Sequence, residues 1–180
     1  MRSMALALLA VLGLSACGGV ATFTADPAHY VLRLDQLVTA NFSVLMPLRH
    51  LDTAGAAYQS AATIEFGREV NFDTANGPLE VSSTVERFAG VDAAAAAYMH
   101  DIAARDATGE TALSTGPLGD AAHADSLVRD SPAGPQAVEI TVEWRTANLV
   151  NVLVVRGRYG GTRLLDGLTL AHRQSANQTV

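Results

Sequence analysis

Residues 138–156 read VEITVEWRTANLVNVLVVR, and this stretch decides the fold. Its first part alternates between apolar and polar residues, which indicates a strand with one apolar face. The apolar face comprises Val138, Ile140, Val142 and Trp144, and the polar face comprises Glu139, Thr141, Glu143 and Arg145. Turn residues 146–148 then lead into the almost continuously apolar run 149–156, which is typical of a central strand. The stretch therefore predicts an antiparallel hairpin in the middle of a sheet.

Similar patterns continue toward the N-terminus. Residues 66–72 and 79–86 alternate on either side of the turn pair Asn76-Gly77, which predicts a second hairpin with one polar face. The Ala-rich segment 91–105 predicts a helix capped by Asp92. Its expected apolar stripe is Ala95, Tyr98, Met99 and Ile102. Residues 106–120 are expected to form a long loop, 125–129 a short strand and 131–135 a turn.

The remaining segments are less regular. Residues 30–37 predict either a first strand or a short helix, and residues 52–62 predict a short Ala-rich helix capped by Asp52 or Thr53. The glycine-containing residues 157–161 are expected to form a loop. A last helix should follow, with a stripe formed by Leu164, Leu165, Leu168 and Ala171.

Taken together, these elements predict an α+β fold: a single domain with an antiparallel β-sheet and two or three helices packed on one face. A chain with 49% hydrophobic and 17% charged residues has the composition of an ordinary packed domain rather than a disordered one. We expect the globular domain to span residues 28–176 and the C-terminal residues 177–180 to fray.

The first residues carry a processing signal. The apolar run from Met4 to Leu14 follows Arg2 and is too short to span a bilayer, which takes about 20 residues. It ends in Leu14-Ser15-Ala16-Cys17, which resembles the lipobox of a bacterial lipoprotein precursor. That resemblance implies a signal peptide at residues 1–16, recognised by its peptidase at Leu14, Ser15 and Ala16. It also implies lipidation of Cys17 and a tether over residues 17–27. The alternatives are an ordinary signal peptide, or a buried N-terminal helix with Cys17 in the core.

Three parts of the remaining chain carry a second resemblance: residues 88–104, Leu118-Gly119-Asp120, and the hairpin 144–155 followed by a terminal amphipathic helix. They are similar to uncharacterised cell-envelope lipoproteins and extracytoplasmic sensor-type domains of high-GC bacteria. All twelve basic residues are arginine, which agrees with a GC-rich genome. The resemblance implies a small envelope domain that binds a ligand or partner and has no known catalysis.

Catalytic and cofactor motifs are absent from the sequence. Neither G-x-S-x-G nor S-x-x-K occurs, and the loop 114–120 makes a poor phosphate cradle because Pro117 lacks an N–H and the chain has no lysine. The five histidines have no metal-ligand spacing, although His123 and Asp125 should share one strand face. These histidines are His29, His50, His100, His123 and His172. We therefore expect no cofactor and no metal.

The charge balance bears on partners. A formal net charge of −6 argues against nucleic acid, so the RGG-like Arg156–Gly161 is interpreted as a loop. Trp144 and Tyr98 are expected in the core, with a ligand pocket as the alternative. We expect a lipid-anchored, extracytoplasmic protein of the cell membrane or outer membrane, without enzymatic activity, that binds an envelope protein or a small apolar ligand. The alternatives are an envelope hydrolase built from distant acidic and histidine residues, and a structural surface lipoprotein without a pocket.

Overall fold

A computed structural model describes residues 22–39, 41–130 and 134–178. The predicted signal peptide with Leu14, Ser15, Ala16 and Cys17 lies outside the described residues, as do part of the predicted tether and part of the predicted turn at 131–135.

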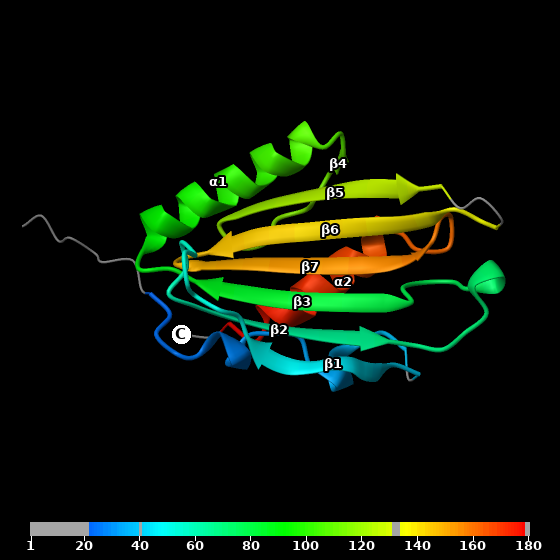
Figure 1. The fold of residues 1–180 in the computed structure, drawn as a ribbon, viewed down its shortest axis with the longest axis horizontal. Helices are drawn as coiled ribbons and strands as arrows, with labels where there is room; N and C mark the ends of the chain where they lie inside the picture. Colours follow the sequence, from blue (N-terminus) through cyan, green and yellow to red (C-terminus); the bar gives the residue numbers. More distant parts are fainter. Residues whose placement is uncertain (1–21, 40, 131–133, 179–180) are drawn as a thin grey trace, which may run out of the picture.

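The described residues form an antiparallel sheet of seven strands flanked by helices (Figure 1). The spatial order of the strands is β1-β2-β3-β7-β6-β5-β4. The strands are β1 (Ser43–His50), β2 (Ser60–Gly67), β3 (Glu80–Arg87), β4 (Thr111–Leu113), β5 (Ala121–Arg129), β6 (Ala137–Thr146) and β7 (Leu149–Arg158). The α-helices are α1 (Val91–Ala107) and α2 (Leu164–Ser175), and the short 3-10 helices are η1 (Pro27–His29), η2 (Leu34–Gln36) and η3 (Phe72–Thr74). The predicted α+β fold with one antiparallel sheet is confirmed.

The β6–β7 hairpin forms as predicted, and β7 is the middle strand of the sheet. The apolar face of β6 is buried, and Trp144 is fully inaccessible. Helix α2 lies directly on this face, because a Cβ added to Gly167 would come within 3.1 Å of Val142 Cγ2. The core on this side also includes Leu32, Phe66, Leu153 and Leu170. The single glycine of α2 thus lets the helix approach the sheet closely.

The two α-helices cover opposite faces of the sheet, with α1 in front and α2 behind in Figure 1. The expectation that the helices pack on one face therefore holds for α2 but not for α1. Glu143, on the predicted polar face of β6, is fully buried and bonded to Arg105 of α1. The reason lies in β7, which is apolar on both faces. Val150 points away from α2 and is buried in a cluster with Phe88, Ala94 and Tyr98.

Several predictions near the N-terminus are wrong. Residues 30–37 form no strand; part of this segment is the 3-10 helix η2, closer to the alternative of a short helix. The Ala-rich helix at 52–62 is absent because Gly55 adopts a positive φ of 78° in a turn, and β2 begins at Ser60. The next predicted strand, residues 66–72, is also misplaced. Strand β2 ends at Gly67, and Phe72 belongs to η3.

Other elements form with different boundaries or faces. Helix α1 is capped by Gly90 rather than Asp92, and it buries Ala94 and Tyr98 while Met99 is 62% exposed. Helix α2 exposes Leu165 and buries Gly167, Leu170, Ala171 and Gln174. Strand β4 lies in the predicted loop 106–120, strand β5 starts earlier than expected, and β7 continues to Arg158.

Candidate functional site

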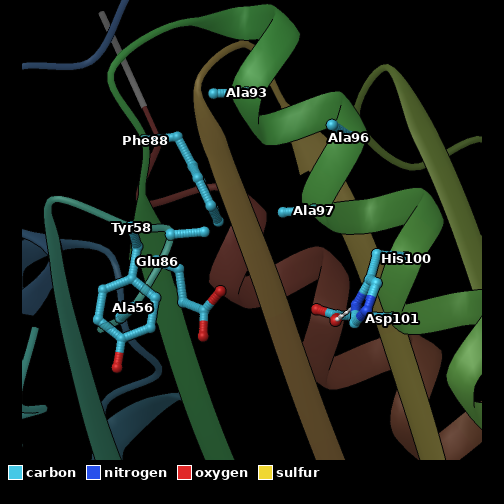
Figure 2. Close-up of a pocket in the computed structure, with 10 residues that line it drawn as sticks. Ala56, Tyr58, Glu86, Phe88, Ala93, Ala96, Ala97, His100 and Asp101 are labelled. Carbon is cyan, nitrogen blue, oxygen red and sulfur yellow. Dashed lines mark hydrogen bonds and ion pairs between the residues drawn. The ribbon is translucent and has the colours of Figure 1, made fainter. Parts of the chain in front are cut away.

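A hollow of about 590 Å³ lies between α1, the end of β3 and the segment that precedes β2 (Figure 2). This volume falls within the range of about 300–1,000 Å³ that is usual for small-molecule pockets. The lining residues are Ala56, Ala57, Tyr58, Glu86, Phe88, Ala93, Ala96, Ala97, His100 and Asp101. Most of these side chains are apolar, so the hollow offers an apolar surface with a small polar portion.

The sequence of α1 explains why space remains. Its flank toward the hollow carries Ala93, Ala96 and Ala97, whose side chains are too small to fill the space beside the helix. Opposite them, Tyr58 and Phe88 meet edge to face with ring centroids 6.5 Å apart. The Tyr58 hydroxyl donates a hydrogen bond of 3.0 Å to the carbonyl of Asp52, which orients the ring. Small residues on the helix and fixed aromatic rings opposite therefore keep the hollow open.

Glu86 is the penultimate residue of β3, and its carboxylate extends into this apolar space (Figure 2). Burial and, to a smaller extent, the nearby charge of Asp101 raise the pKa of Glu86 to about 7. No hydrogen-bond donor from the described residues contributes to this pKa, so the carboxylate faces the hollow without a protein partner. At the rim, Asp101 is paired with the exposed His100, whose Nδ1 lies 3.2 Å from Oδ1 of the carboxylate.

A second cluster of charged side chains lies beneath α1, nearer its C-terminus. Arg105 Nε donates to Asp125 Oδ2 at 2.7 Å, and its Nη2 donates to Glu143 Oε2. Burial raises the pKa of Glu143 to about 7, although Arg105 acts in the opposite direction. The second oxygens of the two carboxylates, Asp125 Oδ1 and Glu143 Oε1, are buried without a partner in the part of the chain that the structure describes. One guanidinium thus serves two buried acids.

The structure brings some of the predicted residues together and separates others. His123 and Asp125 do share one face of β5, with Nε2 and Oδ2 3.6 Å apart, and His100 lies at the rim of the hollow. Trp144 and Tyr98 lie in the core, and neither lines the hollow. Within the described ranges, no three His, Cys, Asp or Glu side chains are placed to hold a metal ion.

Two segments with suggestive sequences have structural roles. Arg156, in the RGG-like segment, pairs with Glu139 at 2.5 Å and lies 3.8 Å from Glu80. In the Leu118-Gly119-Asp120 segment, Leu118 is buried and Asp120 Oδ2 accepts a hydrogen bond from the Ala147 N–H. The latter segment therefore clamps the β6–β7 turn.

Sequence reasoning missed Glu86, Tyr58 and Phe88 as site residues. The alternation of residues 79–86 places Glu86 on the polar face of a predicted hairpin and does not predict a pocket there. The available signal is the run of five alanines at residues 93–97, because such small side chains leave space beside a helix. The same run leaves the hollow on the flank of the helix.

No described helix is both long enough and apolar enough to cross a lipid bilayer. No protein-family model matches the chain, and no curated protein matches it. A solved structure does: the chain is similar to the extracellular domain of PknH from Mycobacterium tuberculosis, with a TM-score of 0.53 and 12% sequence identity. The match covers 88% of this chain and 97% of the other. The two domains therefore share a fold.

Proposed function

We propose that this protein is an extracytoplasmic, non-catalytic binding domain that holds a small, largely apolar ligand in the hollow between α1 and the sheet. The observation that carries the proposal is the hollow itself, about 590 Å³ in volume and lined mainly by alanine and aromatic side chains. A space of this kind, with the carboxylate of Glu86 directed into it, suits binding through apolar contact and one oriented polar interaction. Its lining includes no serine, threonine or cysteine nucleophile.

The extracytoplasmic location is supported by the fold shared with an extracellular domain and by the lipobox-like Leu14-Ser15-Ala16-Cys17. We propose that Cys17 carries a lipid that anchors the protein to the cell membrane or outer membrane. From Cys17 to Phe23 the chain can extend at most about 22 Å. Phe23 and the pocket residue Phe88 both bond to Asn148, so the hollow begins at the end of the domain where the anchor would attach.

Occupancy of the hollow can be tested by filling it. Ala96 is exposed and lines the hollow, so Ala96→Phe places a ring in the space at little cost to folding. The matched control is Ala103→Phe, because Ala103 is also an exposed alanine of α1 but lies outside the lining. Both variants would be titrated with N-phenyl-1-naphthylamine, a neutral apolar fluorophore whose emission rises in an apolar site.

We expect saturable fluorescence enhancement with the wild-type domain and with Ala103→Phe, and an affinity loss of about tenfold or more with Ala96→Phe. That loss corresponds to about 1.4 kcal/mol of binding free energy. Equal titrations of all three proteins, or no saturable binding to the wild type, would contradict the proposal.

A further inference from the structure

We propose that the hollow selects ligands that carry a protonated amine on an apolar body, with the carboxylate of Glu86 as the counter-charge. This inference rests on the proposed function, because it concerns the ligand class of the same hollow. It commits to a small cationic amphiphile rather than to an anion or a neutral lipid.

The first argument is the position of Glu86. Its side chain leaves β3 between the Tyr58 ring and α1 and ends in the hollow (Figure 2). A carboxylate in an apolar space is costly unless it is paired or bonded. The basic side chains of the surroundings are already engaged: Arg105 bonds to Asp125 and Glu143, and Arg87 bonds to Ser60 on the opposite face. A bound cation would supply the partner that the described protein groups do not.

The second argument is the sign of the local charge. The groups that face Glu86 from the elements around it are predominantly acidic or neutral. They are Tyr58 before β2, which itself lies near Asp52, His100 and Asp101 on α1, and Glu143 on β6. An anionic head group would add a further negative charge to this set, and a neutral one would leave the charge of Glu86 uncompensated. An ammonium group is attracted by the carboxylates and by the faces of the Tyr58 and Phe88 rings.

The third argument concerns protons. The raised pKa of Glu86, about 7, means that a ligand which requires the ionised carboxylate must displace a proton at acidic pH. A primary amine stays protonated across this range, as lysine does with a pKa of about 10.4. Amine affinity should therefore weaken as the pH falls below 7, whereas affinity for a neutral ligand should not.

The test uses three competitors with one tail and different heads: octylammonium, 1-octanol and octanoate. Each would displace N-phenyl-1-naphthylamine from the domain at pH 8 and pH 6. We expect octylammonium to bind about tenfold more tightly than 1-octanol at pH 8, because a hydrogen bond to a charged group is worth at least that factor. At pH 6 the preference should shrink several-fold, and octanoate should be the weakest competitor at pH 8.

The matched variants are Glu86→Gln and Glu80→Gln. Glu80 lies on the same strand and the same face as Glu86, is largely exposed, and is outside the lining of the hollow. Glu86→Gln should abolish the preference for the amine while it retains binding of the fluorophore and 1-octanol. Glu80→Gln should behave as the wild type.

The outcomes separate the two proposals. If the fluorophore binds and the amine has no advantage over the alcohol in the wild type, the amine inference is overturned and the binding function stands. If the amine advantage survives in Glu86→Gln, the counter-charge is elsewhere and the inference is again overturned. Failure of all probes to bind the wild type would overturn the binding function itself.

Discussion

Arg105 is the residue on which the buried charges beneath α1 depend. It bonds to Asp125 and Glu143, whose side chains are 2% and 0% exposed. Arg105→Met would keep much of the aliphatic packing and leave both acids without their cation. Breaking a buried pair in this way costs about 3–5 kcal/mol. We expect a loss of that size in the free energy of unfolding, measured by urea denaturation.

The control for this change is Arg129→Met, at the exposed end of β5. It should alter the free energy of unfolding by no more than about 0.5 kcal/mol, as is usual for surface substitutions. Similar, small effects of the two substitutions would show that Asp125 and Glu143 do not need Arg105.

Glu86 should make stability depend on pH. Its pKa is about 7 in the folded chain and near the model-peptide value of 4.5 when unfolded. The folded state therefore binds the proton more tightly, and the associated stability is present below about pH 4.5 and lost as the pH rises to about 7. Glu86→Gln removes this dependence. Urea denaturation should show that the Glu86→Gln variant becomes more stable relative to the wild type as the pH rises from 5 to 8. If the difference in the free energy of unfolding between the two proteins is equal at both pH values, the partly buried environment assigned to Glu86 is wrong.

At the scale of elements, Gly119 determines how the loop before β5 meets the β6–β7 turn. It has a positive φ of 58°, and an added Cβ would lie 2.3 Å from the carbonyl oxygen of Arg145. Gly119→Ala should therefore destabilise the protein by more than about 1 kcal/mol, because both the backbone conformation and the backbone contact oppose the methyl group. Differential scanning calorimetry would measure the fall in Tm.

Gly109→Ala is the matched control, since Gly109 has a φ of 79° but nothing within 4 Å of an added Cβ. Gly109→Ala therefore measures the cost of a positive φ at an alanine without the steric clash that occurs at Gly119. A fall in Tm as large as that of Gly119→Ala would show that the contact with Arg145 is unimportant.

The elements also show how far the sequence could predict the fold. The strands around Trp144 and the helix from Val91 were predictable because a regular period extends over many residues. Strand β1 was not, because it is an edge strand with nearly every side chain exposed, Pro47 within it and two register irregularities. The face of α1 was misassigned because its alanines match a helical stripe in several directions.

The candidate site was less predictable than the fold. Glu86 and Asp101 belong to different elements, and only the crossing of α1 over the sheet brings them to one hollow. Composition revealed that eighteen acidic residues could converge, but not which ones. The partial burial of Glu86, and its lack of a hydrogen-bond partner among the residues that the structure describes, are properties of tertiary packing.

At the scale of the whole molecule, the expected lipid anchor can be tested without reference to the hollow. Cys17→Ser removes the thiol that a lipid would modify. We expect the variant to accumulate as the uncleaved precursor or to leave the membrane fraction, as read by fractionation and by mass spectrometry of the N-terminus. Recovery of a mature-sized Cys17→Ser protein with the membranes would contradict lipid anchoring at this residue.

The way the N-terminal segment joins the domain has a mechanical consequence. The side chain of Asn148 accepts a hydrogen bond from the Phe23 N–H and donates one to the Phe23 carbonyl, at the turn between β6 and β7. A pull on the chain ahead of Phe23 therefore acts on the sheet at the central strand β7 and its neighbour β6, rather than on the edge strand β1. Tension on the N-terminal segment would have to break the two hydrogen bonds between Phe23 and Asn148 before it could separate the strands one by one.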